Sequence, residues 1–461
     1  MKRFDLLRPY ESNDILAVGE PGETATKHVR DLLDDIERVS AQLPDARQHG
    51  AQELLVTCQD RYHLTVALLA AWRSGHTVAL PPNAREETLR ELMPRCALAL
   101  HDGHGIGSNM GGWLADRRRA GSTHAYPAIP AEQPIVTIYT SGSTGQPSAC
   151  AKTAAQLLGE GETLQRTFQL SRNSCVLATV PAHHIYGFLF SVALPLAAGA
   201  RFVRDTPLLP SVIEDYARRH RADVLISVPP HLRVLAESEL SSLASIRTVF
   251  SSGAPLPDAT AHTLHRRFGV NVFEILGSTE TGGFAYRQVD AAGEHGHGAS
   301  FRPFPGVTIA SAENDQLLLS SPLLEAGLEQ PILCPDRIEL RADGSFRHLG
   351  RSDGVIKVGG TRMSLSELEA RVRELAGVSD VAALPADAGG ARGQEVWLVI
   401  ATSHGQALPE LRPHLLRYYD PVLLPRRVRF VDTLPREPTG KLMRARLLEL
   451  FATPKAETMQ P

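Results

Sequence analysis

The sequence lacks the patterns that mark several large classes of protein. Its 461 residues include only five cysteines, an odd number scattered without a CxxC pair or a Cys/His cluster. This usage argues against a disulfide framework or a zinc module and predicts free thiols in a reducing cytoplasm. The formal net charge is only -3, and no run of basic residues is interleaved with aromatic ones. We therefore expect no binding to nucleic acid.

Long apolar runs are missing as well. The longest, residues 187–200, contains Pro195 and is too short to span a bilayer. The first residues carry no apolar segment of the kind that a secretory signal peptide requires. These absences predict a protein that does not associate with a membrane.

What is present is the patterning of a large α/β protein. A chain of this length normally divides into two or more domains. Short apolar runs alternate with segments of helical periodicity, which predicts parallel-type sheets flanked by helices. The expected strands lie at 54–57, 77–80, 97–100, 134–138, 176–180, 224–228, 248–252 and 270–276, and the expected helices at 26–42, 60–72, 85–93 and 154–170. Residues 102–122, which are rich in glycine, are expected to form a surface loop.

The most informative stretch follows the strand at 134–138. It holds two glycines and four hydroxyl residues in six positions: Thr140, Ser141, Gly142, Ser143, Thr144 and Gly145. Such a turn can aim backbone N–H groups and hydroxyls at an anion, which predicts a loop that holds nucleotide phosphates; the alternative is an ordinary Ser/Gly turn. A Walker A loop is not present, because Lys152-Thr153 follows Ala151 rather than a glycine. The spacing thus disfavours a P-loop NTPase.

Three further polar turns follow expected strands. They are Ala-His-His-Ile-Tyr at 182–186, Gly-Ala at 253–254 and Gly-Ser-Thr-Glu at 277–280. Ligands of parallel α/β sheets bind beyond the carboxyl ends of the strands, so these turns are candidates for one site. Glu280 could hold the Mg²⁺ that offsets phosphate charge, since Mg²⁺ takes one or two carboxylates. The alternatives are a solvated carboxylate at Glu280 and hydrogen-bonded structural histidines at His183 and His184.

Taken in order, these motifs resemble those of the adenylate-forming superfamily, which includes acyl-CoA synthetases, aryl acid ligases and peptide-synthetase adenylation domains. The resemblance rests on Tyr-Thr-Ser-Gly-Ser-Thr-Gly-x-Pro at 139–147, on the three turns above, on Asp336, on Gly-Arg-Ser-Asp at 350–353 and on the loop around Lys441. It covers about residues 50 to 450. It implies an ATP- and acid-binding domain over residues 1–350 and a mobile α+β domain over residues 351–461.

The resemblance also implies a role for each matched residue. The nucleotide would contact Thr140, Ser141, Gly142, Ser143, Thr144, Gly145, Gly253, Ala254, Leu276, Gly277, Ser278, Thr279, Asp336 and Arg351. The acid pocket would be lined by His183, His184, Tyr186, Gly253 and Gly277. Catalysis would involve Thr144, His184, Glu280 as the metal ligand, and Lys441, which would reach the site during adenylation. Rotation about Asp353 would then bring Lys357, Gly359 and Gly360 to the thiol step.

The chain departs from the family pattern at several of these positions. His183 stands where an aromatic residue is usual, and Leu276 replaces a tyrosine that stacks on adenine. Ser148-Ala149 replaces the Lys-Gly that normally continues the phosphate loop, which leaves open whether Lys152 substitutes for the missing cation. Gly359 and Leu365 replace a usual lysine and proline.

The function that the resemblance implies is that of an ATP- and Mg²⁺-dependent carboxylic acid ligase. Such an enzyme forms an acyl-adenylate, releases pyrophosphate, and passes the acyl group to the thiol of CoA or an acyl carrier protein. The chain is similar to compact ligases of aryl-polyene and xanthomonadin-type pathways, which favours a hydroxybenzoate-like aryl acid. A medium- or long-chain fatty acid ligase and a degenerate, non-catalytic binding protein on the same fold are the alternatives. The sequence leaves the thiol acceptor and the oligomeric state open.

Overall fold

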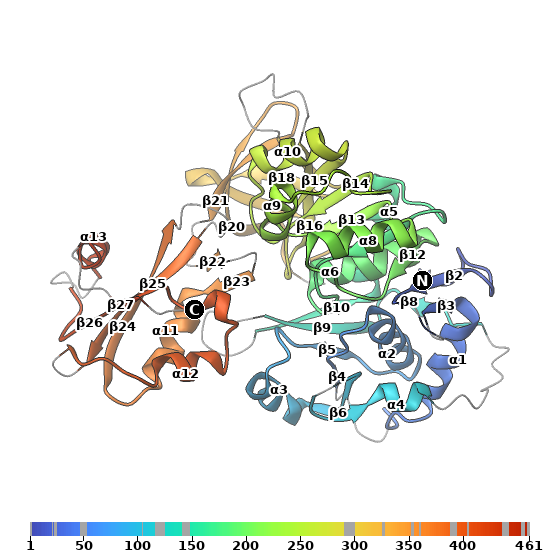
Figure 1. The fold of residues 1–461 in the computed structure, drawn as a ribbon, viewed down its shortest axis with the longest axis horizontal. Coiled ribbons are helices and arrows are strands. Elements are labelled where there is room, and N and C mark those ends of the chain that lie inside the picture. The colour runs from blue at the N-terminus through green and yellow to red at the C-terminus, as the bar shows by residue number, and fades with distance from the viewer. Residues whose placement is uncertain are drawn as a thin grey trace. The chain divides into compact units, whose positions relative to one another are not determined.

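The structure is a computed structural model that describes most of the chain in two compact units. The described residues are 2–20, 22, 25–46, 53–103, 105–115, 125–140, 148–289, 300–324, 328–351, 355–358, 361–387, 394–402, 405–435, 442–452 and 457–458. The first unit comprises residues 1–140 and 149–352, and the second comprises residues 141–148 and 353–461. Each unit is described on its own below (Figure 1).

The first unit begins with a six-stranded sheet in the order β10-β9-β5-β4-β6-β7. Its strands β4, β5, β6, β7 and β9 pair in parallel, as the strand–helix alternation predicts. The strands are β4 (Glu53–Val56), β5 (Val78–Leu80), β6 (Cys96–His101), β7 (Ser108–Asn109), β9 (Pro134–Thr140) and β10 (Ser148–Thr153). The helices of this region are α1 (Val29–Ser40), α2 (Arg61–Arg73), α3 (Glu86–Leu92) and α4 (Met110–Ala115). A small two-stranded sheet pairs β1 (Arg3–Phe4) with β8 (Ile129–Pro130).

A second, nine-stranded sheet has the order β17-β16-β15-β14-β13-β11-β12-β2-β3. Its central strands are parallel, whereas β16 is an antiparallel neighbour of both β15 and β17. The strands are β2 (Ile15–Val18), β3 (Thr26–His28), β11 (Cys175–Ala178), β12 (Arg201–Val203), β13 (Val224–Ser227), β14 (Thr248–Ser251), β15 (Asn271–Ser278), β16 (Gly282–Gln288) and β17 (Arg302–Pro303). The helices are α5 (Ala154–Phe168), α6 (Ile185–Phe188), α7 (Leu194–Ala198), α8 (Pro210–His220), α9 (Pro229–Glu237) and α10 (Asp258–Phe268).

Helix α2 links the two sheets. Asp60 caps it by accepting hydrogen bonds from the backbone N–H groups of Tyr62 and His63, as predicted. Nearly all of its residues are buried, and the guanidinium of Arg61 donates to the backbone oxygens of Val203 (2.6 Å) and Val180 (3.1 Å) beside the second sheet. The helix is therefore a shared core element rather than a surface cover.

An antiparallel four-stranded sheet completes the first unit. Its strands are β18 (Thr308–Ser311), β19 (Gln316–Ser320), β20 (Ile332–Leu340) and β21 (Phe346–Arg351). The hairpin formed by β20 and β21 confirms the one expected from the alternating residues 337–349. Its apolar residues share a core with the β15–β16 hairpin, because Phe284 and Ala285 cluster with Cys334 and Ile338.

The second unit is a small α+β module with its own core. Its elements are β22 (Val355–Val358), β23 (Thr361–Ser364), α11 (Leu365–Arg373), β24 (Val378–Asp387), β25 (Gln394–Thr402), α12 (Leu411–Leu416), β26 (Arg427–Val431), α13 (Arg444–Glu449) and β27 (Glu457–Thr458). Strand β25 pairs antiparallel with β24 and parallel with β26. Leu368, Val381, Leu398 and Leu415 are fully buried between the helices and this sheet.

The structure confirms the α/β fold class and corrects two local predictions. Residues 102–122 are not one surface loop, because β7 and α4 form within them and Met110 is buried in the main core. The glycines of that stretch hid a helix whose apolar side chains anchor it. Residues 26–28, expected to open the first helix, instead pair with β2, and α1 begins at Val29. Sheet pairing overrides helical periodicity there.

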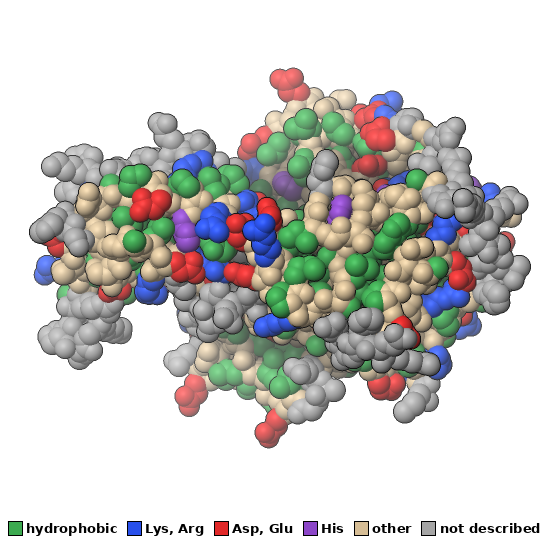
Figure 2. Space-filling model, turned by 90° about the horizontal axis from the view of Figure 1, so that it is seen from below, with side chains coloured by type: hydrophobic (Ala, Val, Ile, Leu, Met, Phe, Trp, Pro, Cys, Tyr) green, Lys and Arg blue, Asp and Glu red, His purple; other side chains and the backbone are tan. Residues whose placement is uncertain are grey.

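The surface carries charges of both signs. On the face seen in Figure 2, Lys and Arg side chains are interspersed with Asp and Glu. Within the described part of the chain, no helix combines the length and apolarity that a membrane crossing needs.

Candidate functional site

The parallel register of the second sheet gathers the predicted turns at one edge. Strands β11, β13, β14 and β15 run in the same direction, with Ser227 opposite Ser251 and Ser251 opposite Glu274. His183 and Gly253 lie in the segments that follow β11 and β14, and Gly277 lies at the carboxyl end of β15. Three of the sequence-predicted turns therefore lie at the carboxyl ends of β11, β14 and β15 in one parallel run of strands, where α/β proteins bind ligands.

The turn after β11 carries the two histidines of the expected acid pocket. Their rings lie 4.4 Å apart, and His184 is exposed at the start of α6. Burial, together with the neighbouring His184, lowers the pKa of His183 well below its ordinary value, so His183 is neutral at pH 7. The turn requires glycine at position 187, because an added Cβ there would lie 2.0 Å from the backbone oxygen of Pro181. The glycine permits the tight turn that presents both rings.

A buried polar network lies beside this turn. Thr179 Oγ1 is 2.8 Å from Ser227 Oγ and 3.0 Å from Nδ1 of His231, which lies in α9. The hydroxyl of Ser251 is buried and makes no hydrogen bond to any residue that the structure describes. Sequence reasoning missed Thr179, His231 and Ser251, although each lies within or just after a predicted strand. Polar atoms here can orient a polar substituent of a ligand.

The turn after β14 is tied to β15. Gly253 has a φ of +89°, which favours glycine, and the hydroxyl of Ser252 donates to the backbone oxygen of Ile275 at 2.9 Å. This bond ties the segment of Gly253 and Ala254, which are predicted to contact the nucleotide, to the strand that carries Leu276. Leu276 packs on the apolar cluster of β16 and β20 and offers an aliphatic rather than an aromatic surface.

The turn from Ser278 to Thr281 joins β15 to β16 and carries Glu280. The Ser278 N–H donates to Thr281 Oγ1 (3.0 Å), and the Thr281 N–H donates to Ser278 Oγ (3.2 Å). Thr279 is buried, whereas Glu280 is exposed. At Gly277 an added Cβ would lie 2.5 Å from the backbone oxygen of Gly282, so the hairpin closes only with glycine there.

Two buried ionisable side chains, Lys152 and Glu160, form hydrogen bonds with the backbone of this hairpin. The ammonium of Lys152, in β10, donates to the backbone oxygens of Glu280 (2.8 Å) and Leu323 (3.3 Å). Glu160, in α5, accepts a 2.7 Å hydrogen bond from the Gly283 N–H. Burial raises the pKa of Glu160 to about 7, although that bond and the charge of Lys152 act in the opposite direction. Sequence reasoning also missed Glu160. The signal that could have found it is a glutamate among the apolar positions of the helix expected at 154–170.

Asp336 and Arg351 are partners in the antiparallel pairing of β20 and β21. The pairing makes neighbours of two residues that are predicted to contact the nucleotide. Asp336 is buried, and its carboxylate lies 2.8 Å from Nε2 of His348, which sequence reasoning did not single out. Cys334, two residues earlier, shares a cluster with Leu276, which links this strand to the adenine candidates.

The remaining predicted site residues divide into two that the structure describes and others that it does not. Thr140 lies at the carboxyl end of β9, and Lys357 lies in β22 of the second unit. The remaining residues lie outside the described part of the chain: Ser141, Gly142, Ser143, Thr144, Gly145, Asp353, Gly359, Gly360 and Lys441. Their roles stay predictions.

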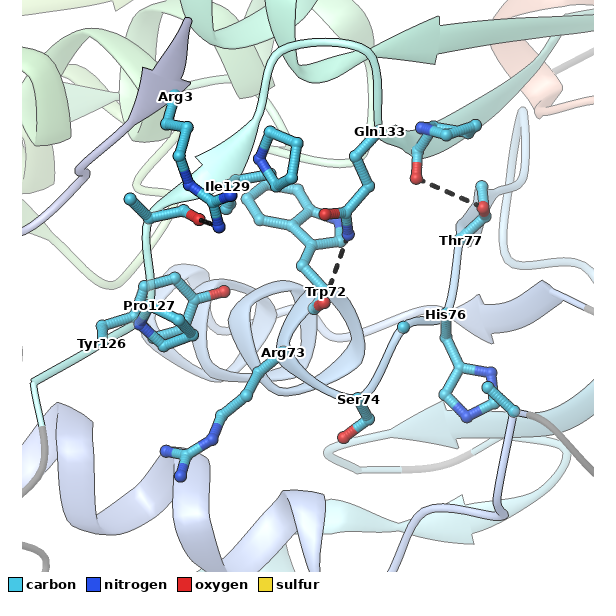
Figure 3. Close-up of a pocket in the computed structure, with 15 residues that line it drawn as sticks. Arg3, Trp72, Arg73, Ser74, His76, Thr77, Tyr126, Pro127, Ile129 and Gln133 are labelled. Atoms are coloured by element: carbon cyan, nitrogen blue, oxygen red, sulfur yellow. Dashed lines mark hydrogen bonds between the residues drawn. The ribbon is translucent and has the colours of Figure 1, made fainter. Parts of the chain in front are cut away.

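A cavity of about 740 Å³ lies away from these turns (Figure 3). Its walls come from the end of α2 and the segment before β9, with Gln133 Nε2 donating to the Trp72 backbone oxygen at 3.2 Å. It borders Thr77 and Pro134, at the amino ends of β5 and β9, whereas Thr140 ends β9 at the other side of the sheet. None of the sequence-predicted site residues lines it.

Comparison with known proteins identifies the class. Residues 11–317 match the family described as AMP-binding enzyme, so the chain belongs to that family of adenylate-forming ligases. It is 28% identical to sulfoacetate–CoA ligase from Cupriavidus necator over 69% of this chain and 67% of that protein. It is 27% identical to 4-hydroxybenzoate–CoA/benzoate–CoA ligase from Rhodopseudomonas palustris over 68% of this chain and 64% of that protein. The chain thus spans about two thirds of the length of these relatives.

Solved structures show the same fold over nearly the whole chain. o-Succinylbenzoate CoA synthetase from Bacillus subtilis superposes with a TM-score of 0.82 at 17% identity, covering 97% of this chain and 98% of that one. The amide bond synthetase McbA from Marinactinospora thermotolerans gives a TM-score of 0.80 at 17% identity, over 97% and 99% of the two chains. The likeness confirms the fold expected from the motifs.

Proposed function

We propose that this protein activates a carboxylic acid with ATP and transfers the acyl group to a phosphopantetheine thiol of CoA or an acyl carrier protein. The observation that carries the proposal is the parallel register that gathers three predicted ligand turns at one sheet edge. Family membership supports it, as do relatives named as acid–CoA ligases.

The first step would join the acid to the nucleotide. A carboxylate oxygen attacks the α-phosphorus of ATP, the bond between that phosphorus and the bridging oxygen breaks, and pyrophosphate leaves. Because two anions meet, catalysis is chiefly positioning and charge stabilisation. The hydroxyls of residues 140–144, Thr279 and the ammonium of Lys441 are the groups that would do this. No general base is needed, because the carboxylate attacks in its ionised form.

Mg²⁺ fits the residues at the β15–β16 turn. The carboxylate of Glu280 is exposed on a rigid turn, and Mg²⁺ commonly binds through one or two carboxylates while keeping several waters. When bound, the ion would offset the charge of the phosphates. Within the described residues, no group of three or more His, Cys, Asp and Glu side chains offers a competing metal site.

The second step would release AMP. A thiol attacks the acyl carbon of the adenylate, the thiol proton goes to solvent, and AMP leaves with the bonding electrons. In this proposal the chain acts as a 1–350 domain and a mobile 351–461 domain. Rotation near Asp353 exchanges Lys441 for the Lys357, Gly359 and Gly360 face.

A reducing cytoplasm is the compartment we propose for this protein, which fits the five cysteines, none of which forms a disulfide.

The acid we favour is a hydroxybenzoate-like aryl acid. The ring centroids of Tyr186 and Phe190 lie 5.1 Å apart, as do those of Phe190 and Phe250. Tyr186 and Thr179 both lie in the stretch that follows β11. Aromatic side chains, together with the hydroxyl and imidazole groups of Thr179, Ser227 and His231, suit a hydroxylated ring better than a long alkyl chain. The relative from Rhodopseudomonas palustris is named for 4-hydroxybenzoate and benzoate.

A pyrophosphate-release screen over aryl and fatty acids tests the proposal. Each acid is offered with ATP and Mg²⁺, with CoA or a holo acyl carrier protein as acceptor. We expect acid-dependent release that is highest with a hydroxybenzoate. Preference for fatty acids would overturn the substrate assignment. Phosphate release without any acid, or no release with any acid, would overturn the activity itself.

A further inference from the structure

Lys152 is a buried lysine whose ammonium is used by the backbone of other segments. The residue is only 3% exposed, and its ammonium donates to the carbonyl oxygens of Glu280 and Leu323. A buried ammonium is costly unless its charge and its donors are satisfied. Apolar packing alone would not favour a lysine at this buried position, so its two hydrogen bonds to the chain around the Ser278–Thr281 turn explain why it is there.

Glu160 holds the same hairpin from α5, through its hydrogen bond to the Gly283 N–H. Helix α5 begins directly after β10, and its capping box, formed by Thr153 and Gln156, fixes where the helix starts. The Glu160 carboxylate reaches the hairpin backbone because residues 282 and 283 are glycines. An added Cβ at Gly282 would lie 2.7 Å from Oε2 of Glu160, and one at Gly283 would lie 3.0 Å from Oε1. Two glycines and a buried carboxylate thus form one fitted contact.

Both ends of the turn are consequently held from the β10–α5 segment. Lys152 binds the carbonyl of Glu280, and the Cys150 thiol lies 3.5 Å from the carbonyl oxygen of Thr279. Glu160 holds the N–H of Gly283 on the returning strand. The same segment follows the predicted phosphate loop in the chain, so it connects the two parts of the site that would hold phosphate and metal.

We propose that Lys152 and Glu160 are positioning residues that fix the backbone of the 278–283 turn and so direct the Glu280 carboxylate towards a divalent metal bound with ATP. This rests on the proposed function, because Glu280 is the metal ligand only there. Lys152 does not replace the missing phosphate-loop lysine by contacting phosphate; it acts through the turn. Partners behind a metal ligand commonly control metal affinity in this way.

The first test measures, without any ligand, how firmly Lys152 and Glu160 hold the backbone of the 278–283 turn. Hydrogen exchange of the peptide covering residues 276–284 is compared between the wild-type chain and the double variant Lys152→Met/Glu160→Gln. The double variant replaces both ionisable groups at once, so neither a lone ammonium nor a lone carboxyl group is left in the interior. Lys27→Met is the matched control, since Lys27 also binds a buried carboxylate, that of Asp35, at 2.8 Å but lies in another element.

We expect the double variant to exchange at least ~10-fold faster in this peptide, with other strands of the unit unchanged. The control should leave the peptide as protected as in the wild type. Unchanged protection in the double variant would overturn the proposal that the two side chains hold this turn. So would a uniform rise over the whole unit, because it would reveal general destabilisation instead of a local role.

The second test measures the consequence for metal binding. Calorimetry gives the affinity for α,β-methylene-ATP with Mg²⁺ and with EDTA, and therefore needs no knowledge of the acid. We expect the double variant to lose roughly 10-fold of the gain that Mg²⁺ gives, while the affinity measured in EDTA stays unchanged. The same loss with and without Mg²⁺, or a wild-type gain in the variant, would overturn the positioning role. A wild-type chain that binds no nucleotide would instead overturn the proposed function, and the positioning role with it.

Discussion

Two hairpins of the first unit reverse the chain in different ways. The turn between β20 and β21 is closed by its own residues: Asp343 accepts bonds from the Ser345 N–H (3.0 Å) and hydroxyl (2.6 Å). The turn between β15 and β16 is held in addition by Lys152 and Glu160, which come from more than 120 residues earlier in the chain. A hairpin that only reverses the chain needs local bonds. One that must present a carboxylate at a fixed place benefits from charges buried beneath it.

The largest expected effect on the rate of adenylation comes from Lys441, which belongs to neither turn. Its size is the reference against which changes in the two turns are compared. Lys441→Ala should slow adenylation at least ~10²-fold, about 2.7 kcal/mol, yet spare thioester formation from preformed adenylate. The reason is that the lysine would stabilise charge only in the first step. Single-turnover assays of the two half-reactions measure this. An equal loss in both would contradict the division of labour between the steps.

Glu280→Gln tests the β15–β16 turn directly. We expect acid-dependent pyrophosphate release to fall ~10²-fold, because the neutral amide binds Mg²⁺ poorly and charge stabilisation is lost. Asp343→Asn is the matched change in the other turn and should leave the rate unchanged. If both variants react equally fast, the contrast between the turns has no functional meaning.

Two glycines separate the turns by their effect on stability. Gly277→Ala should cost more than about 3 kcal/mol in the free energy of unfolding, because its Cβ would meet backbone atoms that cannot withdraw. Gly344→Ala has open space around the new Cβ, and its cost, about 1 kcal/mol, comes only from the φ of +79°. Urea unfolding of the two variants measures the difference. Equal costs would show that the β15–β16 hairpin is less tightly closed than the structure indicates.

The pH dependence of stability should have opposite signs for the two carboxylates. Burial raises the pKa of Glu160 to about 7 from 4.5, so the folded chain binds that proton more tightly than the unfolded chain. Its contribution to the free energy of unfolding therefore falls as pH rises from about 4.5 to 7. Glu160→Gln removes this dependence and should gain on the wild type across that window, by roughly 2–3 kcal/mol in all.

Bonds from Ser345 lower the pKa of Asp343, so its contribution is present above its ordinary pKa of 3.8 and is lost as pH falls. Asp343→Asn should accordingly differ least from the wild type at acidic pH. Unfolding measured between about pH 2 and 8 follows both variants, with the Asp343 effect at the acidic end and the Glu160 effect between about pH 4.5 and 7. A Glu160→Gln variant that runs parallel to the wild type across this range would contradict the buried, proton-binding state of Glu160.

Much of the fold could be predicted from local sequence, because local signals determine it. Asp60 marks the start of α2, and alternation marks the β20–β21 hairpin. The candidate turns could be predicted too, since each follows a strand. The side chains behind them could not. Lys152, Glu160 and His348 act through contacts that only the folded chain creates, and the Lys152 bonds span 128 and 171 residues of sequence.

Crystallography of the full chain with ATP and Mg²⁺ tests the central claim most directly. We predict adenine against Gly253, Ala254 and Leu276, ribose at Asp336, and the metal at Glu280, with its turn in the conformation described above. A nucleotide bound in the cavity between Trp72 and Gln133, or anywhere away from the carboxyl ends of β14 and β15, would contradict it.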